Sequence, residues 1–288
     1  MRYLKKSVFY LLIFILLLNF IFCQTKGVFY EISSDDSRVY TLGSIHLGTP
    51  DLYPLNPIIE KAFEKSEVLA VELDITDPKN VFKAQAYILK KGLYKKGDSI
   101  ENHADPELVK DLKEVLGEEN FEKIKFYKPW VLLFQISSSL AYNTLDVKYG
   151  IDFYFINKAE ESDKKIVALE TVEEQLDAFS EIPEEDQLKI LKSNLEELKD
   201  LKDKKIEEYY SELLNAYKNG DKEKLEELLL GDLKKEGYDV FYQYVYIKRN
   251  FRFAERIKSL MKDYKSIFVV IGAGHLIGEE NVVKLLQN

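Results

Sequence analysis

The chain has 288 residues, of which 46% are hydrophobic and 32% charged, a composition typical of a soluble globular protein with a proper core. Its net charge of −9 argues against nucleic acid as a partner, because a polyanion needs a basic face. The single Cys excludes an intrachain disulfide and a Cys-based zinc site, and His occurs only three times.

Residues 1–23 have the pattern of an export signal. Arg2, Lys5 and Lys6 form a positively charged start, and an apolar stretch follows that reaches Cys23. The stretch is short for a membrane span and typical of a secretory signal. Three outcomes stay open: a lipoprotein signal with lipid on Cys23, ordinary cleavage, or an uncleaved anchor. All three predict an exported protein, either anchored in the cell envelope or secreted, that meets a membrane only through this segment or its lipid.

From residue 27 onward, strand and helix patterns alternate in the order typical of an α/β fold. The expected elements, in chain order, are a β-hairpin at 28–32 and 38–42, helix 57–66, strand 68–73, helices within about 79–160, strand 164–169, helices within about 183–263, strand 266–271 and helix 281–286. They predict one domain, residues 27–288, with a mixed, mostly parallel central sheet. The helical insertions at about 79–160 and 183–263 would form a cap over it.

Four apolar runs rich in Val and Ile each end in a His or a Glu. His46 follows the run at 39–42, Glu72 the run at 68–71, Glu170 the run at 166–169 and His275 the run at 267–271. Such runs are typical of parallel strands buried on both faces, and these sheets bind ligands beyond the carboxyl ends of their strands. Two His and two Glu that converge there would form a metal-ligand set.

Each of these residues also has a purely structural interpretation. A lone His after a strand is more often a core or surface residue, although both occur here in Gly-x-x-His. A partly buried Glu72 needs either a metal or a Lys or Arg partner from the cap. Glu170 would equally suit the N-terminus of a helix. Arg249, in an aromatic-rich helix, predicts either an anion-binding group or a structural ion pair.

Three other polar residues complete the candidates. Asp152, in Gly150-Ile151-Asp152, is expected to cap a helix. Asp74 lies two residues beyond Glu72 on the same side of the strand. It is therefore a candidate to contact the metal ligands without binding the metal itself. We expect His103 on the surface, since it lies in a polar stretch. The chain contains no Gly-x-Ser-x-Gly and no phosphate-binding Gly-x-x-x-x-Gly-Lys, so neither of those hydrolase types is supported.

Several short sequence blocks, in their order along the chain, resemble those of the TraB/PrgY/GumN family, which is related to the Tiki metalloproteases. The blocks that carry the resemblance are Thr41-Leu42-Gly43-Ser44-Ile45-His46, Val71-Glu72-Leu73-Asp74, Lys128-Pro129-Trp130, Gly150-Ile151-Asp152, Leu169-Glu170-Thr171, Arg249-Asn250 and Gly272-Ala273-Gly274-His275. The resemblance implies a Tiki/ChaN-like α/β fold and, in the Tiki branch, a protease that depends on a divalent metal, with manganese or cobalt favoured over zinc. Ser44 stands where Thr is common in the family.

Carried over by position, His46, Glu72 and His275 would hold the metal. Glu170 would be the general base or a further ligand, and Arg249 would orient the substrate or stabilise an oxyanion. The sequence thus predicts a metal-dependent hydrolase, a peptidase acting on peptides or proteins. Two alternatives stay open: a binding protein that sequesters peptides without cleaving them, and an accessory protein of envelope polysaccharide production.

Overall fold

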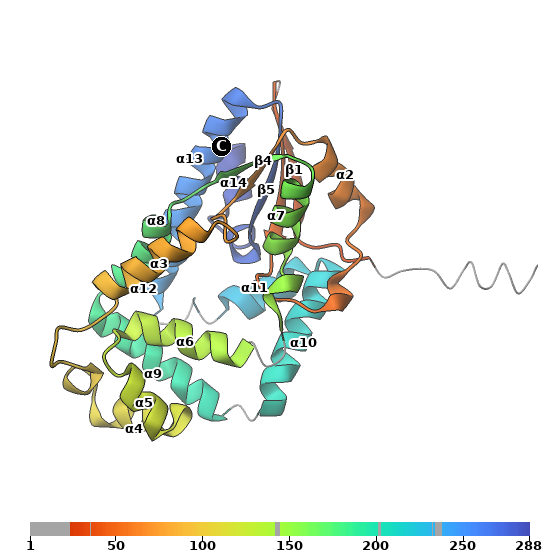
Figure 1. Ribbon diagram of the computed structural model, residues 1–288. Coiled ribbons are helices and arrows are strands. Elements are labelled where there is room, and N and C mark those ends of the chain that lie inside the picture. The colour runs from red at the N-terminus through yellow and green to blue at the C-terminus, as the bar shows by residue number, and fades with distance from the viewer. Residues whose placement is uncertain (1–23, 35, 142–144, 201–202, 232, 234–237) are drawn as a thin grey trace, which may run out of the picture.

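The structure is a computed structural model that describes residues 24–34, 36–141, 145–200, 203–231, 233 and 238–288 (Figure 1). Its centre is a five-stranded sheet in the order β1-β2-β5-β3-β4. The strands are β1 Phe29–Ser33, β2 Arg38–Ser44, β3 Val68–Val71, β4 Lys165–Ala168 and β5 Ser266–Gly272. Only β1 runs antiparallel to its neighbour. The prediction of a mixed, mostly parallel sheet is therefore confirmed.

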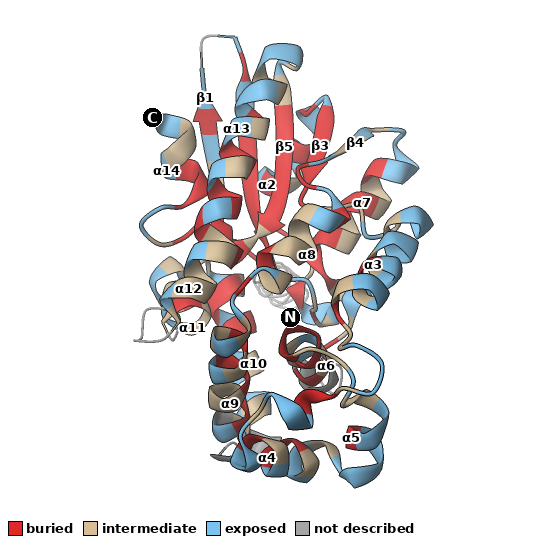
Figure 2. Cartoon of the chain, turned by 90° about the vertical axis from the view of Figure 1, so that its left-hand side faces the viewer, coloured by how far each residue is buried: buried red, intermediate tan, exposed pale blue. Residues whose placement is uncertain are grey.

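The central strands of the sheet are its most buried part, as the colours of Figure 2 show. Every residue of β3 is buried, as are the five central residues of β5. The expectation of burial on both faces is wrong for β4, whose Lys165 and Ala168 are exposed. The reason is its position at the edge of the sheet, where it pairs only with β3.

Helices cover both faces of this sheet (Figure 1). The helical elements are η1 Pro50–Leu52, α2 Pro57–Lys65, α3 Pro78–Lys91, η2 Ile100–Asn102, α4 Pro106–Leu116, α5 Glu118–Ile124, α6 Pro129–Ala141, η3 Val147–Tyr149, α7 Ile151–Glu161, α8 Val172–Ser180, α9 Glu184–Asp200, α10 Asp203–Asn219, α11 Lys222–Leu230, α12 Asp239–Tyr242, η5 Gln243–Ile247, α13 Lys248–Asp263, η6 Ala273–His275 and α14 Val282–Gln287. On one face, Phe63 of α2 and Phe155 of α7 pack against Phe268 of β5. Helices α13 and α14 lie on the other face.

Local sequence explains where several helices begin. Asn56, Asp77 and Asp105 each accept a hydrogen bond from a backbone N–H of the first turn of α2, α3 and α4, and a proline follows each of them. A side-chain cap stabilises a helix by about 1 kcal/mol, and proline is pre-shaped for the first helical position. The predicted start of a helix at residue 57 is confirmed.

Helices from both insertions build a cap beyond the carboxyl ends of the parallel strands (Figure 1). The cap has a hydrophobic core of its own, in which Leu112 and Phe121 of the first insertion pack in one cluster with Leu191 and Leu195 of the second. This shared core joins α4, α5 and α6 to α9. The exact domain boundaries stay a prediction.

The predicted export signal lies outside the described residues. Among the residues that the structure does describe, no helix has the length and apolar character needed to cross a bilayer.

Candidate functional site

The carboxyl ends of the parallel strands lie side by side, as the sequence predicts. In the register of the sheet, Ser44 of β2 is opposite Gly272 of β5, and Val71 of β3 is opposite Ala168 of β4. The pairing continues past the strands, because the Glu170 N–H donates to the Glu72 carbonyl over 3.0 Å. The segments that carry the predicted His and Glu residues therefore leave the sheet at the same edge.

Gly272 is the backbone position around which the three predicted metal ligands gather. Its N–H donates to Glu72 Oε1 over 2.5 Å. A Cβ atom placed on Gly272 would lie 3.1 Å from Glu72 Oε1, 3.5 Å from His275 Cδ2 and 3.7 Å from His46 Nε2. Three side chains from segments far apart in sequence thus meet beside one glycine, where a larger residue would crowd them.

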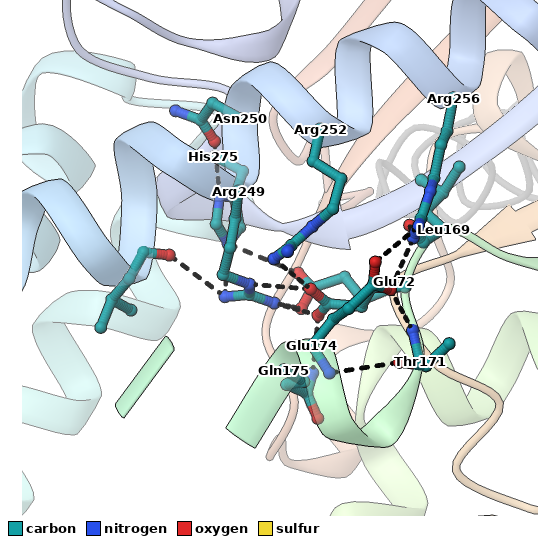
Figure 3. Close-up of polar contacts among 12 residues, drawn as sticks. Glu72, Leu169, Thr171, Glu174, Gln175, Arg249, Asn250, Arg252, Arg256 and His275 are labelled. Atoms are coloured by element: carbon teal, nitrogen blue, oxygen red, sulfur yellow. Dashed lines mark hydrogen bonds and ion pairs between the residues drawn. The ribbon is translucent and has the colours of Figure 1, made fainter. Parts of the chain in front are cut away.

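Arg249 enters this group from α13 and is the charged centre of the site. Its Nη2 donates to Glu72 Oε2 over 2.6 Å and to Glu170 Oε1 over 2.5 Å, and its Nε donates to Glu170 Oε2 over 3.1 Å. Its Nη1 donates to His275 Nε2 over 3.1 Å. Figure 3 shows Arg249, Glu72 and His275 turned toward one another. The alternative that Glu72 pairs with a Lys or Arg is confirmed, since Arg249 is its partner.

The two carboxylates differ in the environment that sets their pKa values. Burial opposes ionisation of Glu72, but Arg249, the two histidines and the Gly272 N–H outweigh it and hold the pKa of Glu72 well below its usual range. Burial dominates at Glu170, so the pKa of that carboxyl is raised although Arg249 opposes the shift. Such a pair, pushed apart in pKa, is the pattern by which acid and base roles are divided.

Glu170 is held by more than Arg249. Gln175 Nε2 donates to Glu170 Oε1 over 3.1 Å, and Arg252 Nη2 lies 3.3 Å from Glu170 Oε2. The alternative that Glu170 serves the N-terminus of a helix is wrong. Thr171 caps α8 with Glu174 in a capping box, which leaves the Glu170 side chain to face the site.

His275 is buried and fixed in one tautomer by Asn250. Asn250 Nδ2 donates to the Glu280 carbonyl over 2.7 Å, so its Oδ1 is the atom that faces His275 Nδ1 at 2.6 Å. His275 Nδ1 must then carry the proton, which leaves a lone pair on Nε2. Burial and the nearby Arg249 lower the pKa of His275 to about 3, so its ring is neutral at physiological pH.

His46 lies at the open side of the site, with its side chain 63% exposed. Its Nδ1 donates to Asp152 Oδ2 over 2.8 Å, and this carboxylate raises the pKa of His46 to about 9. Solvent around the exposed ring screens that attraction, so its energetic worth is small. The geometric consequence is firmer: with Nδ1 bound to Asp152, the other ring nitrogen faces the recess beside Gly272.

Two sequence predictions about supporting residues are wrong. Asp152 does not cap α7, which begins after Gly150, but holds His46. Asp74 does not support the site: its Oδ1 accepts from the N–H and the hydroxyl of Thr76 in a local turn. His103 is exposed, as expected. Its ring contacts Asp98 and Glu184, neither of which belongs to the site.

Sequence reasoning gave no role to Asn250, and it missed Tyr246. Asn250 directly follows Arg249 in one of the blocks that carry the family resemblance, and this was the available signal for it. Tyr246 stacks obliquely on the His275 ring, with ring centroids 5.1 Å apart. Nothing in the sequence separates this tyrosine from the other aromatic residues of the segment.

The donor types fit a divalent metal ion. Two imidazoles with anchored Nδ1 atoms and an ionised carboxylate are the ligand types that proteins use for such ions. The His275 ring is neutral, whereas His46, with its raised pKa, would have to give up its Nε2 proton to the ion. In the present arrangement, however, the described residues hold no group of three His, Cys, Asp or Glu side chains spaced to bind a metal. Arg249 binds both Glu72 and His275 Nε2, so an ion would compete with its guanidinium for these atoms.

Comparison with known proteins places these residues in a wider group. The model of the TraB/PrgY/gumN family matches residues 28–288. An uncharacterized protein of Treponema pallidum (strain Nichols) is 23% identical over 272 residues, which cover 91% of this chain and 80% of that protein. The uncharacterized protein YbaP of Escherichia coli (strain K12) is 22% identical over 251 residues, 86% of this chain and 87% of the relative.

Metalloprotease TIKI1 of Xenopus tropicalis is 23% identical over 308 residues. The match covers 88% of this chain but 58% of the metalloprotease, so the chain spans little more than half the length of that relative. No solved structure matches the chain significantly.

Proposed function

Since this chain belongs to the TraB/PrgY/gumN family, we propose that it is a divalent-metal-dependent hydrolase whose substrates are peptides or proteins. The observation that carries the proposal is the matched pair of histidines. Each has its Nδ1 held by an oxygen acceptor, and each directs Nε2 to the site that contains the ionised Glu72. Similarity to metalloprotease TIKI1 supports the reaction class.

In this proposal His46, Glu72 and His275 hold the ion. A bound divalent ion would lower the pKa of a water molecule and polarise the scissile carbonyl. Asn250 keeps the His275 imidazole in the tautomer that leaves Nε2 bare, and Asp152 holds the Nδ1 proton of His46, so that Nε2 is the nitrogen that would lose its proton to the ion. Arg249 keeps the two site carboxylates together, and the N–H groups that an ion would displace from Glu72 and His275 would be free to orient a substrate carbonyl or carboxylate.

Glu170 is the proposed general base. Burial raises the pKa of the Glu170 carboxyl. Its carboxylate is therefore a stronger base than that of an exposed Glu, as a general base requires. Gln175 and Arg249 fix the orientation of the carboxylate. A carboxylate of this kind accepts a proton from the attacking water and returns it to the leaving amine.

We further propose manganese or cobalt rather than zinc, on the strength of the family resemblance and of the carboxylate among the ligands, which suits harder ions. We also propose that the protein is exported and acts in the cell envelope. The support is the sequence pattern of residues 1–23, with Cys23 as the candidate lipidation site.

One observation favours a second candidate, a protein that binds peptides without cleaving them. Arg249 already occupies His275 Nε2 and Glu72, the atoms that an ion would need. With this contact kept, no ion can reach His275 Nε2 and Glu72, and a peptide held beside them would keep its peptide bond intact.

Incubation of the purified protein with an unbiased peptide library tests the proposal, with products read by mass spectrometry under manganese, cobalt, zinc or a chelator. Wild type is compared with Glu170→Gln and with the matched control Glu174→Gln. Glu174 lies four residues away and pairs with Arg256, and glutamine retains its capping role.

We expect metal-dependent cleavage by wild type and by Glu174→Gln. Loss of the general base in Glu170→Gln should lower the rate by roughly 10²–10⁴-fold. Absence of cleavage by folded wild type under every metal would refute the hydrolase. Saturable peptide binding that survives Glu170→Gln, with no products, would establish the second candidate instead.

A further inference from the structure

Helix α3 carries a concentration of positive charge that contrasts with the rest of the chain. Residues 78–96, which contain the helix and the five residues after it, hold six lysines and no Asp or Glu, whereas the whole chain has a net charge of −9. One of the six, Lys91, pairs with Asp177 of α8. The other five are exposed and form no ion pair with the described residues: Lys79, Lys83, Lys90, Lys95 and Lys96. Their charge is therefore available to an anionic partner.

The exposed face of α3 also carries large apolar side chains. Phe82 is 76% exposed, the highest fraction among the exposed large hydrophobic residues that the structure describes, and Leu89 is 65% exposed. Val81, beside Phe82, is 48% exposed. A single exposed apolar residue is ordinary, but several on one helix, next to lysines without partners, are typical of a surface that binds something.

Helical spacing places the apolar and the charged side chains in neighbouring rows. Phe82 and Leu89 are seven residues apart, close to two turns, so they lie on the same side of the helix. Lys83 and Lys90 each follow one of them directly, so their row lies about 100° further round the helix. On the opposite side, Tyr87 is buried and its hydroxyl binds α8. Packing thus fixes α3 to the body of the protein and leaves both rows outward, and exposed residues follow the helix in Figure 2.

We propose that this exposed face of α3 docks on the surface of an anionic lipid bilayer. Helices that lie in a membrane interface have this composition: Phe and Leu enter the boundary between headgroups and acyl chains, and lysines extend to the negative headgroups. Charge complementarity selects an anionic bilayer over a zwitterionic one. A folded protein would need a preformed pocket for each projecting apolar side chain, whereas a fluid bilayer adapts to them.

The docking face is a second membrane contact, separate from the export signal that the sequence predicts at residues 1–23. The inference goes beyond the proposed hydrolase, because the contacts of α3 with a bilayer are the same whether or not the site cleaves peptides.

Flotation with lipid vesicles tests the docking. The vesicles contain equal parts of phosphatidylglycerol and phosphatidylcholine, or phosphatidylcholine alone, and the buffer contains a chelator. All variants share the N-terminus of the wild type, so a difference between them comes from α3. We expect wild type to prefer the anionic vesicles. Lys79→Gln/Lys83→Gln/Lys90→Gln should weaken this binding by roughly 100-fold, since each lysine beside an anionic membrane contributes about fivefold.

Two further variants separate charge from apolar contact. Phe82→Ser/Leu89→Ser keeps every lysine and should weaken binding by roughly tenfold or more, because two apolar side chains no longer enter the bilayer. The matched charge control is Lys258→Gln/Lys262→Gln/Lys265→Gln, which removes three exposed lysines at and just beyond the end of α13. It should bind like wild type at physiological salt, which screens distant charges. Thermal unfolding reports whether each variant is folded.

Phe82→Trp places a fluorescent reporter on the docking face, so binding through another part of the chain leaves its signal unchanged. Trp130, the only tryptophan of the chain, is buried and gives a constant background. We expect the emission of Phe82→Trp to move to shorter wavelength with anionic vesicles and to stay unchanged with phosphatidylcholine alone.

Unchanged binding of the α3 lysine variant, or anionic vesicles that leave the emission of Phe82→Trp unshifted, would overturn the docking face. Binding of a labelled peptide of glutamates through the same lysines, with no binding of vesicles, would overturn it as well and indicate an acidic protein partner. None of these measurements involves a metal ion or cleavage, so their outcome is independent of the outcome for the proposed hydrolase.

Discussion

Replacing Arg249 by methionine should destabilise the protein more than any exposed charge change, because it leaves two buried carboxylates without their cation. The Arg249 side chain is 5% exposed, and those of Glu72 and Glu170 are 9% and 0% exposed. Methionine keeps much of the volume of the side chain but none of its donors. Breaking a buried ion pair by removal of one partner costs about 3–5 kcal/mol of unfolding free energy.

The cost should also depend on pH, with a sign that follows from the pKa shifts. In wild type the pKa of Glu72 is depressed, so its contribution to stability is present above the ordinary Glu pKa and is lost as the pH falls through the folded value. In Arg249→Met burial acts without the guanidinium, and the pKa values of Glu72 and Glu170 rise. The folded variant then binds protons more readily than its unfolded chain and becomes more stable as the pH falls.

The assay is urea unfolding in the presence of a chelator at about pH 7.5 and about pH 5, values above and near the ordinary Glu range. We expect the difference between wild type and Arg249→Met to be smaller at the lower pH. Arg252→Met, one turn further along α13 and 28% exposed at its side chain, is the control and should cost about 1 kcal/mol or less. A cost below about 1 kcal/mol for Arg249→Met at the higher pH, or an equal cost at both values, would refute the reasoning.

Three further predictions follow from single contacts. Asp152→Ala removes the acceptor that orients the exposed imidazole, so manganese affinity in isothermal titration calorimetry should fall by roughly 10–100-fold; an unchanged affinity would deny Asp152 that role. Gly274→Ala places a Cβ 2.5 Å from Tyr246 Cε1 and should lower the unfolding free energy by about 1–3 kcal/mol in thermal denaturation, whereas wild-type stability would show that the ring moves freely. Tyr217→Phe deletes the buried hydroxyl that donates to the Gly43 carbonyl over 2.5 Å; urea unfolding should show a loss of about 1 kcal/mol, and no loss would mean that the bond contributes nothing net.

The sheet could be predicted from sequence because buried parallel strands leave an unambiguous signal. The run at 267–271 is apolar at every position and appears as the central strand β5, and the hairpin at 28–42 appears as β1 and β2. The half-exposed state of β4 could not be predicted, since its run at 166–169 is as apolar as those of the inner strands. Edge position depends on strand order, which no local pattern encodes.

The site was predictable where its residues follow strands and unpredictable where they arrive from helices. Glu72 and His275 meet because parallel strands end at one edge of the sheet, and this rule can be applied to the sequence alone. Asp152 and Asn250 reach the histidines through the packing of α7 and α13, which the sequence does not specify. The pattern Gly150-Ile151-Asp152 is the same whether Asp152 caps a helix or binds a histidine. Only the tertiary contacts decide the role of Asp152.

The central claim is that His46 and His275 converge on one divalent ion, and metal binding tests it most directly. Isothermal titration with manganese, cobalt and zinc, together with metal analysis of the purified protein, should give about one ion per chain, as expected for a site of this donor type. The ion should be lost in His46→Ala/His275→Ala and retained in His103→Ala, the third histidine of the chain. Failure of wild type to bind any of these ions, or retention of the ion by the double variant, would contradict the account.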